Sequence, residues 1–319
     1  MSAPLDAAIE DLLSGNPARQ AHADSELHRL AGDASLRHAL LEKLTPLVDH
    51  DSTQVRLVAL QVVASVLGEQ ALPMLEAHAG DPDSEVRAAV EDAAEELGPA
   101  AKSLLSRFLE DPEFVVRFWA ASALAETGEA AAFPVLVEGL DESSTRFEAL
   151  YALRALADPR ALEPARHIFA KWGIAPTERA AAAGVLARLG DAEGKAYLVA
   201  ELDRKRSHAR GLAVELCGDL KLTEAAEALE RILHDRQDLM RGAAAISLGR
   251  MKVARLVPEL SALLADANED PDLRADFAEA LAAMGGDEAG KAISAAIASA
   301  KEPELREALE EARASFEGR

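Results

Sequence analysis

Residues 81–110 read DPDSEVRAAVEDAAEELGPAAKSLLSRFLE, and this stretch contains one complete unit of the chain. Asp81 or Ser84 can cap a helix, because a short side chain bearing oxygen accepts a hydrogen bond from a free N–H at a helix start. Apolar residues then follow at helical spacing until Gly98-Pro99, which ends the helix: Val86, Val90, Ala93, Ala94 and Leu97. A second apolar face follows, with Leu104, Leu105 and Phe108. The stretch therefore predicts two helices joined by a short turn.

The same unit returns along the chain at intervals of 29 to 33 residues. An arginine marks each return: Arg56, Arg87, Arg117, Arg146, Arg179, Arg210, Arg241, Arg274 and Arg306. Alanine usually stands three residues after the arginine, and a larger apolar residue usually stands seven after it. Self-similarity at a fixed period is typical of a repeat array, in which each unit packs on its neighbours.

The runs DPDSEVRAAVEDAAEELG, DPEFVVRFWAASALAETG and LMRGAAAISLGRM resemble the short HEAT-like repeats first named in phycobilisome lyases. The resemblance covers roughly residues 35–316. It implies an all-α solenoid, a right-handed superhelix of about nine helix pairs, with the arginine-bearing helices on the concave side. We expect one solenoid over residues 1–319, with an irregular N-terminal cap at 1–50, regular repeats at 51–299 and a C-terminal capping helix at 300–319.

In repeats of this kind the recurring aspartate and arginine bond between adjacent turns of the stack. Four pairs match that pattern: Asp81/Arg87, Asp111/Arg117, Asp141/Arg146 and Asp235/Arg241. The resemblance therefore implies that the nine arginines form a structural ladder with partners for their charge. The alternative is a row of anion-binding groups, which the acidity of the chain disfavours.

The formal net charge is −22. Such a charge opposes binding to nucleic acids and to anionic membranes, and it favours basic partners or simply solubility. The N-terminal MSAPLDAAIEDLL lacks the basic region of a signal peptide, and no long uninterrupted apolar stretch predicts a membrane span. Cys217 is the single cysteine, which excludes an intramolecular disulfide. We expect a cytoplasmic protein without membrane insertion.

Motifs for catalysis are missing from the sequence. None of the eight histidines is followed by glutamate, whereas di-iron enzymes on a HEAT scaffold carry paired His-Glu dipeptides. No CxxC, GxxxxGK[ST] or GxGxxG stretch offers a zinc site or a phosphate-binding loop. Cys217 takes the place of a core leucine or valine, which predicts a buried thiol. We therefore predict no metal, no cofactor and no enzymatic activity.

One stretch stands out as a candidate binding surface. Helical geometry turns the positions one, two, five and nine residues after each arginine away from the core. These positions gather aromatic residues in two successive repeats: Phe118, Trp119, Phe147 and Tyr151, with Phe114 just before them. Carboxylates are expected beside them, at Asp92, Glu95, Glu96 and Glu126. The alternative is that Phe118 and Trp119 fill gaps between alanine-rich helices.

Charge is unevenly distributed along the chain. Residues 81–140 hold 13 Asp and Glu against 4 Lys and Arg, whereas residues 176–256 hold 12 against 14. We therefore predict a protein-binding scaffold whose concave groove takes a basic or amphipathic segment of a partner. Two alternatives stay open: an enzyme or chaperone similar to the phycobilin lyases, and a nucleic-acid binder similar to HEAT-type DNA glycosylases. The sequence does not define the oligomeric state.

Overall fold

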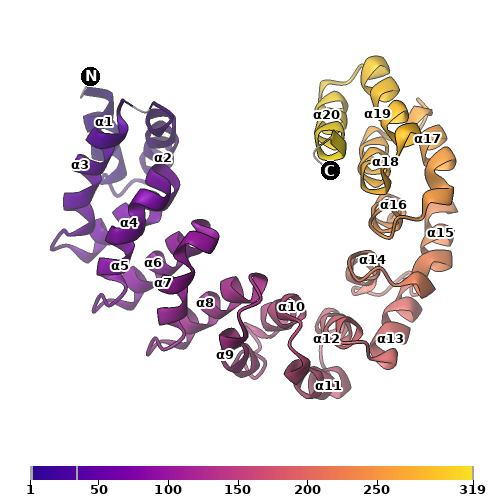
Figure 1. The fold of residues 1–319 in the computed structure, drawn as a ribbon, viewed down its shortest axis with the longest axis horizontal. Coiled ribbons are helices and arrows are strands. Elements are labelled where there is room, and N and C mark those ends of the chain that lie inside the picture. Colours follow the sequence, from indigo (N-terminus) through magenta and orange to yellow (C-terminus); the bar gives the residue numbers. More distant parts are fainter. Residues whose placement is uncertain (1–2, 34, 318–319) are drawn as a thin grey trace. The chain divides into compact units, whose positions relative to one another are not determined.

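A computed structural model describes residues 3–33 and 35–317, and in these residues it contains twenty α-helices, six short 3-10 turns and no strand (Figure 1). The prediction of an all-α solenoid is confirmed. Contacts divide the chain into two compact units, residues 1–158 (unit 1) and residues 159–319 (unit 2). The remaining residues of the predicted caps (1, 2, 34, 318 and 319) lie outside the described part. That the whole chain forms one solenoid stays a prediction.

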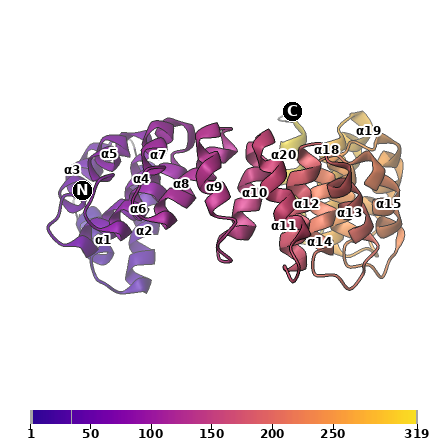
Figure 2. The same ribbon diagram turned by 90° about the horizontal axis from the view of Figure 1, so that it is seen from below.

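Unit 1 is a stack of helices in two layers (Figures 1 and 2). The arginine-bearing helices pack side by side: α4 (Thr53–Leu67), α6 (Ser84–Glu96), α8 (Phe114–Glu126) and α10 (Arg146–Leu156). The short helices α5 (Leu72–His78), α7 (Lys102–Phe108) and α9 (Phe133–Glu138) follow them in the chain and cover their apolar side. The stack begins with α1 (Ala3–Leu12), α2 (Pro17–Ala31) and α3 (Arg37–Val48).

Unit 2 repeats this arrangement (Figure 1). One layer holds α12 (Pro176–Arg188), α14 (Arg210–Asp219), α16 (Arg241–Arg250), α18 (Pro271–Met284) and α20 (Pro303–Glu317). The other layer holds α11 (Leu162–Ala170), α13 (Ala192–Leu202), α15 (Ala226–His234), α17 (Val257–Ala265) and α19 (Asp287–Ser299). The arginine-bearing helices approach closely because they meet through small residues. A Cβ atom added to Gly249 would lie 2.7 Å from the backbone of Ala280.

Most arginine-bearing helices are followed, within two residues, by a residue with positive φ. Glycine holds this place at Gly68, Gly98, Gly128, Gly190 and Gly285, as the left-handed conformation favours. Three repeats use another residue instead: Ala157, Lys221 and Lys252 have φ of 52°, 51° and 55°. The packing of the repeat therefore requires a left-handed residue at this turn, and glycine adopts that conformation with less backbone strain.

The segment Thr53–His78 is long and apolar enough to cross a membrane by length and composition alone. Core helices of soluble proteins have the same length and composition. In unit 1 the segment is α4, a 3-10 turn at Gly68–Ala71 and α5, and Ala59, Leu60 and Val63 of α4 are buried against neighbouring helices. The apolar character of this segment is explained by packing in the repeat array.

Candidate functional site

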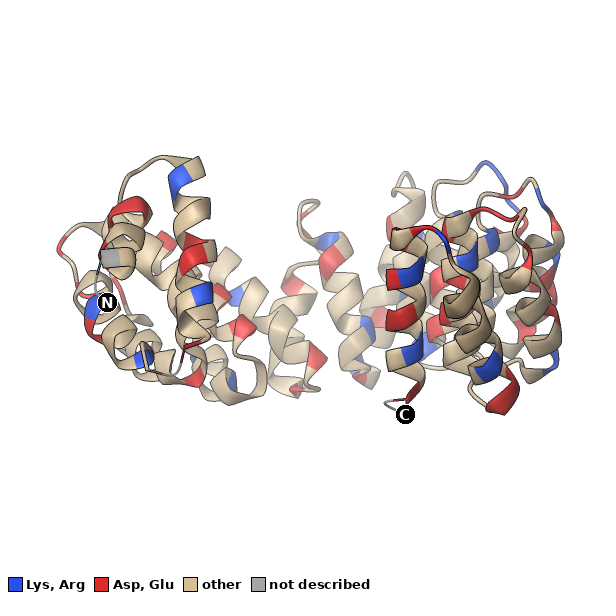
Figure 3. Cartoon of the chain, turned by 90° about the horizontal axis from the view of Figure 1, so that it is seen from above, with Lys and Arg blue, Asp and Glu red and all other residues tan. Residues whose placement is uncertain are grey.

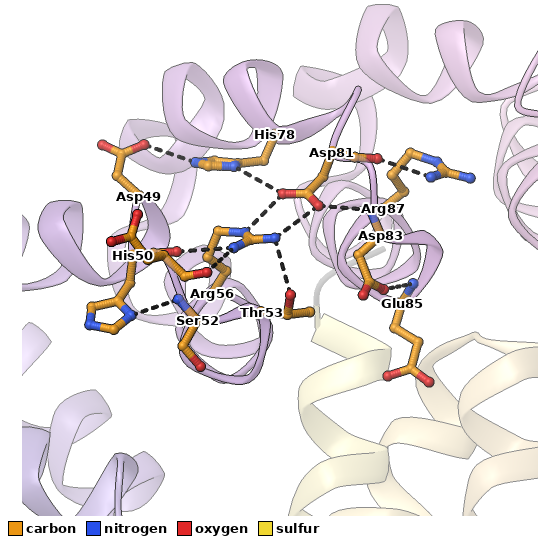
Figure 4. Close-up of polar contacts among 11 residues, drawn as sticks. Asp49, His50, Ser52, Thr53, Arg56, His78, Asp81, Asp83, Glu85 and Arg87 are labelled. Carbon is orange, nitrogen blue, oxygen red and sulfur yellow. Dashed lines mark hydrogen bonds and ion pairs between the residues drawn. The ribbon is translucent and has the colours of Figure 1, made fainter.

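The recurring arginines join consecutive repeats. The Nε and Nη2 atoms of Arg56 donate to the two carboxylate oxygens of Asp81, at 2.9 and 3.0 Å (Figure 4). Its Nη1 atom donates to the backbone carbonyls of His50 and Asp51, at 3.0 and 3.2 Å. Asp81 also accepts a hydrogen bond from the backbone N–H of Asp83, just before α6. One guanidinium therefore holds the loop before its own helix and the loop before the next helix.

This arrangement corrects the register of the predicted pairs. Arg87 pairs with Asp111 of the following repeat, through bonds of 2.7 and 3.0 Å, and not with the side chain of Asp81. It reaches Asp81 through the backbone carbonyl, at 2.9 Å. In the same way, Arg117 donates to the carbonyl of Asp111. The carboxylate partner lies one repeat later because the guanidinium, at the start of its helix, faces the next loop of the stack.

The same contacts recur in unit 2, with variations. Arg210 makes two bonds to Asp238, at 2.8 and 2.7 Å, and Arg241 donates to Glu269 at 2.8 Å. Ladder arginines also donate to a backbone carbonyl at or near the end of the preceding helix: Arg146 to Leu140, Arg179 to Phe169, Arg210 to Leu202, Arg241 to Leu233, Arg274 to Leu264 and Arg306 to Ala300. Because these groups are used in the stack, the contacts support a structural ladder over a row of anion-binding sites.

In two buried ion pairs of the ladder, the arginine stabilises the charge of its carboxylate partner. The hydrogen bonds from Arg210 lower the pKa of Asp238 in spite of its burial. Burial alone would raise the pKa of Asp111, but the hydrogen bonds from Arg87 and from the Glu113 backbone outweigh it and keep the pKa below its usual value. Both carboxylates therefore stay ionised beside their arginines, as buried ion pairs require.

The predicted aromatic patch divides into an exposed part and a buried part. Trp119 on α8 and Tyr151 on α10 are 41% and 37% exposed. Phe114 and Phe147 are half-buried. Phe118 is fully buried, so the prediction that it is exposed is wrong. Its ring packs so closely on Gly139 that an added Cβ would lie 2.6 Å away, and Trp119 meets it edge-on with the ring centroids 5.3 Å apart.

The exposed aromatic rings have different surroundings. Trp119 packs one side on the buried Phe118. Tyr151 has the guanidinium of Arg154 over its ring, at 4.4 Å from the centroid. An arginine therefore already makes on this face the cation–π contact that a basic partner would make.

The four predicted carboxylates all lie on the surface of unit 1. Asp92, Glu95 and Glu96 belong to α6, and Glu126 ends α8. Partial burial raises the pKa of Glu95, and the neighbouring charges of Glu126 and Asp92 raise it further. The charges of Glu95 and Glu126 therefore repel each other across the two helices, and a cation placed between them would relieve that repulsion.

A small pocket lies between these two carboxylates. It has a volume of about 150 Å³, and its lining includes Glu95, Glu126, Lys102 and the apolar Leu105 and Leu124. Lys102 is itself paired with Glu129, at 2.5 Å. The pocket thus combines an apolar wall with two carboxylates, which suits a side chain with an aliphatic stem and a cationic end.

Glu91, four residues after Arg87, is a buried carboxyl at a position where the repeat pattern predicts an apolar residue. It is 1% exposed, and its Oε1 atom has no hydrogen-bond partner among the described residues. Burial raises its pKa to about 9, with smaller contributions from the charges of Asp92 and Glu95. A signal was present in the sequence, because the position four residues after the ladder arginine is apolar in neighbouring repeats, at Leu60, Ala121 and Leu150.

Other candidates for chemistry do not assemble into a site. Cys217 is buried, which raises the pKa of its thiol to about 12, so the thiol is protonated and inert at neutral pH. In the described ranges no group of three or more His, Cys, Asp or Glu side chains could hold a metal ion. Figure 3 shows both signs of charge interleaved on the helices near the C-terminus.

Comparison with known proteins identifies the repeat type. The family model for HEAT repeats matches residues 39–125, 101–171 and 232–314, which together make up more than half of the chain. No curated protein sequence matches the chain.

Several solved structures resemble the chain weakly. Human deoxyhypusine hydroxylase in complex with glycerol is 25% identical over 81% of this chain and 99% of that one, with a TM-score of 0.36. Importin β is 14% identical over 97% and 51% of the two chains, with a TM-score of 0.46. Kap95p, from a structure with RanGDP, is 15% identical over 98% and 50%, with a TM-score of 0.41. The chain spans about half the length of the last two.

Proposed function

Because this chain belongs to the HEAT-repeat family, we propose that it is a non-enzymatic scaffold that binds a basic or amphipathic segment of a partner protein. Repeat arrays of this kind offer an extended surface and leave function to the residues on it. We place the binding surface on unit 1, over α6, α8 and α10, and call it the acidic-aromatic face. Its members are Asp92, Glu95, Glu96, Trp119, Glu126 and Tyr151.

The pocket between Glu95 and Glu126 is the observation that carries the proposal. Two carboxylates flank an apolar wall, and the cationic side chain in the pocket lining, Lys102, already pairs with Glu129. An arginine or lysine of the partner would place its stem against Leu105 and Leu124 and its charge between the carboxylates.

The exposed rings support the choice of an amphipathic segment. Trp119 and Tyr151 belong to neighbouring helices of the same layer. Tryptophan and tyrosine are enriched among the residues that carry most of the binding energy of protein interfaces. Phe118, being buried, serves as support beneath Trp119 and is not expected to contact the partner.

The proposal is tested with a fluorescein-labelled helical peptide that carries arginine on one face and leucine on the other. We expect the double variant Trp119→Ala/Tyr151→Ala to weaken binding at least tenfold, since hot-spot residues each contribute roughly 2 kcal/mol or more. Glu95→Gln/Glu126→Gln should weaken it several-fold and flatten its dependence on salt.

A matched control removes the same charge elsewhere. Glu304 and Glu307 are exposed on α20, so Glu304→Gln/Glu307→Gln should leave the affinity unchanged. Equal affinity of the wild type and both unit 1 variants would contradict the proposal. So would equal losses in the control and in Glu95→Gln/Glu126→Gln, because binding would then follow net charge alone.

A further inference from the structure

The loop edge of unit 2 carries a second candidate binding site, which is independent of the acidic-aromatic face. A pocket of about 750 Å³ lies between the loop before α12 and the loop before α14. Its lining contains four cationic side chains (Arg179, Arg204, Lys205 and Arg206) and one carboxylate, Glu201. Three of these cations, Arg204, Lys205 and Arg206, are consecutive in a chain with a net charge of −22.

The cationic side chains in this pocket differ in the number of hydrogen bonds and ion pairs that they make within the protein. Arg179 donates to the carbonyls of Phe169 and Lys171, at 2.7 and 2.9 Å, and thereby holds the first loop. Arg204 pairs with the buried Glu201 at 2.9 Å, and Lys205 pairs with Asp235 at 2.5 Å. Arg206 is exposed and has no hydrogen bond or ion pair within the described part of the chain. The pocket thus keeps one uncompensated guanidinium at its edge.

The neutral part of the pocket is apolar and aromatic. Ile174 lines it from the first loop, Pro176 from the start of α12, and Tyr197 from α13. The ring of Tyr197 is fixed edge-on against Phe169, with centroids 5.2 Å apart, and the guanidinium of Arg204 lies 5.9 Å from its centroid. These contacts give the pocket a rigid wall beside its charged rim.

Trp172 lies two residues before Ile174 and is 96% exposed. Its loop is part of a repeat step of 33 residues between Arg146 and Arg179, which is among the longest in the chain. An indole this exposed contributes little to the fold, whereas an exposed tryptophan on a loop that also lines a pocket can anchor a ligand. One loop therefore supplies an apolar anchor and the next supplies positive charge.

We propose that this edge, formed by Trp172, Ile174, Tyr197, Arg204, Lys205 and Arg206, binds an acidic peptide segment that contains an apolar residue. Carboxylates of the peptide pair with Arg206, because a guanidinium group matches the geometry of a carboxylate. They also pair with the N–H groups of Arg204 and Lys205 that do not contact Glu201 or Asp235. The apolar residue packs on Trp172 and Ile174. A nucleic acid is disfavoured, because the acidic remainder of the chain repels a long polyanion.

Fluorescence anisotropy with two probes tests the proposal on the full chain. One probe is a fluorescein-labelled peptide of glutamates and aspartates around a central leucine. The other is a single-stranded DNA oligonucleotide of the same net charge. We expect the peptide to bind more tightly than the DNA and to shift the emission of Trp172 to shorter wavelength.

The variants are chosen to leave the fold intact. Arg206→Glu should weaken peptide binding at least tenfold, and Trp172→Ala should weaken it several-fold. Lys301, which is exposed in the loop before α20, provides the matched charge reversal, and Lys301→Glu should change the affinity less than twofold. Equal affinity for wild type and Arg206→Glu, equal losses in Arg206→Glu and Lys301→Glu, or tighter binding of the DNA would each overturn the proposal.

Discussion

Unit 1 buries the unpartnered carboxyl of Glu91 at the helix position where unit 2 buries Val214 and Ala245. The surfaces differ as well. Exposed aromatic rings and carboxylates gather on the helices of unit 1, whereas basic residues and an exposed tryptophan gather on the loop edge of unit 2. Both units nevertheless use the same arginine contacts between repeats. The two units thus share the arginine contacts between repeats and differ in the residues at individual core and surface positions.

The largest expected effect tests whether the ladder serves both units equally. Arg87→Ala leaves the buried Asp111 without its guanidinium partner, and Arg210→Ala does the same to Asp238. Each change should lower the free energy of unfolding by about 3–5 kcal/mol, the usual effect of breaking a buried ion pair. Urea unfolding measures both losses. Arg306→Ala, where the guanidinium donates to the Ala300 carbonyl, should cost only about 1 kcal/mol.

A loss below about 1 kcal/mol for Arg87→Ala would show that water replaces the guanidinium. A clear difference between Arg87→Ala and Arg210→Ala would show that the two units depend unequally on the ladder.

The next effect concerns Glu91, whose position in the repeat holds the buried apolar residues Val214 and Ala245 in unit 2. Its pKa in the folded chain, about 9, lies above the ordinary 4.5, so the folded state holds a proton that the unfolded state releases. The resulting stability is fully present below pH 4.5 and is lost as the pH rises toward 9. At pH 7 the loss is about 3 kcal/mol, which Glu91→Gln should restore.

Thermal unfolding of wild type and Glu91→Gln between pH 4 and pH 9 measures this difference. Plots of melting temperature against pH for the two proteins should meet near pH 4 and separate as the pH rises. Curves that stay parallel over the whole range would contradict the assignment of a protonated Glu91.

A third prediction tests the burial of Phe118. Gly139→Ala places a methyl group 2.6 Å from the Phe118 ring and should lower the free energy of unfolding by about 1–3 kcal/mol. Gly211 of unit 2 is the control, because a Cβ there meets nothing closer than the Met240 sulfur at 3.7 Å. Gly211→Ala should therefore be neutral or stabilising, and urea unfolding distinguishes the two outcomes. Equal changes in the free energy of unfolding for the two variants would mean that the Phe118 ring moves away from the new methyl group without a loss of stability.

The smallest expected effect lies in the turns of unit 2. Lys221 and Lys252 hold the left-handed conformation that glycine adopts in most repeats. Lys221→Gly and Lys252→Gly should each raise the free energy of unfolding by up to about 1 kcal/mol, since glycine adopts positive φ without strain. A rise in melting temperature checks this. A fall would indicate that the lysine side chains contribute contacts that outweigh the strain.

Much of the fold follows from periodicity alone. The spacing of Arg56, Arg87 and Arg117 predicts a repeat, and the apolar residues around each arginine predict a buried helix face. The candidate site was less predictable. Trp119 and Tyr151 are exposed as their positions suggest, but Phe118 turns toward Gly139 of the following loop. The helical position of Phe118 predicts exposure, but it does not show that a glycine in a neighbouring loop leaves space for the ring to pack.

By itself, the sequence determined the all-α repeat architecture, the helix boundaries near each turn glycine and the acidic character of the surface, because these depend on local spacing and composition. Tertiary structure alone decided which carboxylate each ladder arginine meets, that Glu91 is buried without a partner, and that the loops of 171–176 and 203–207 share one basic pocket. Each of these depends on which residues of neighbouring repeats face one another, and that register arises only when the helices stack.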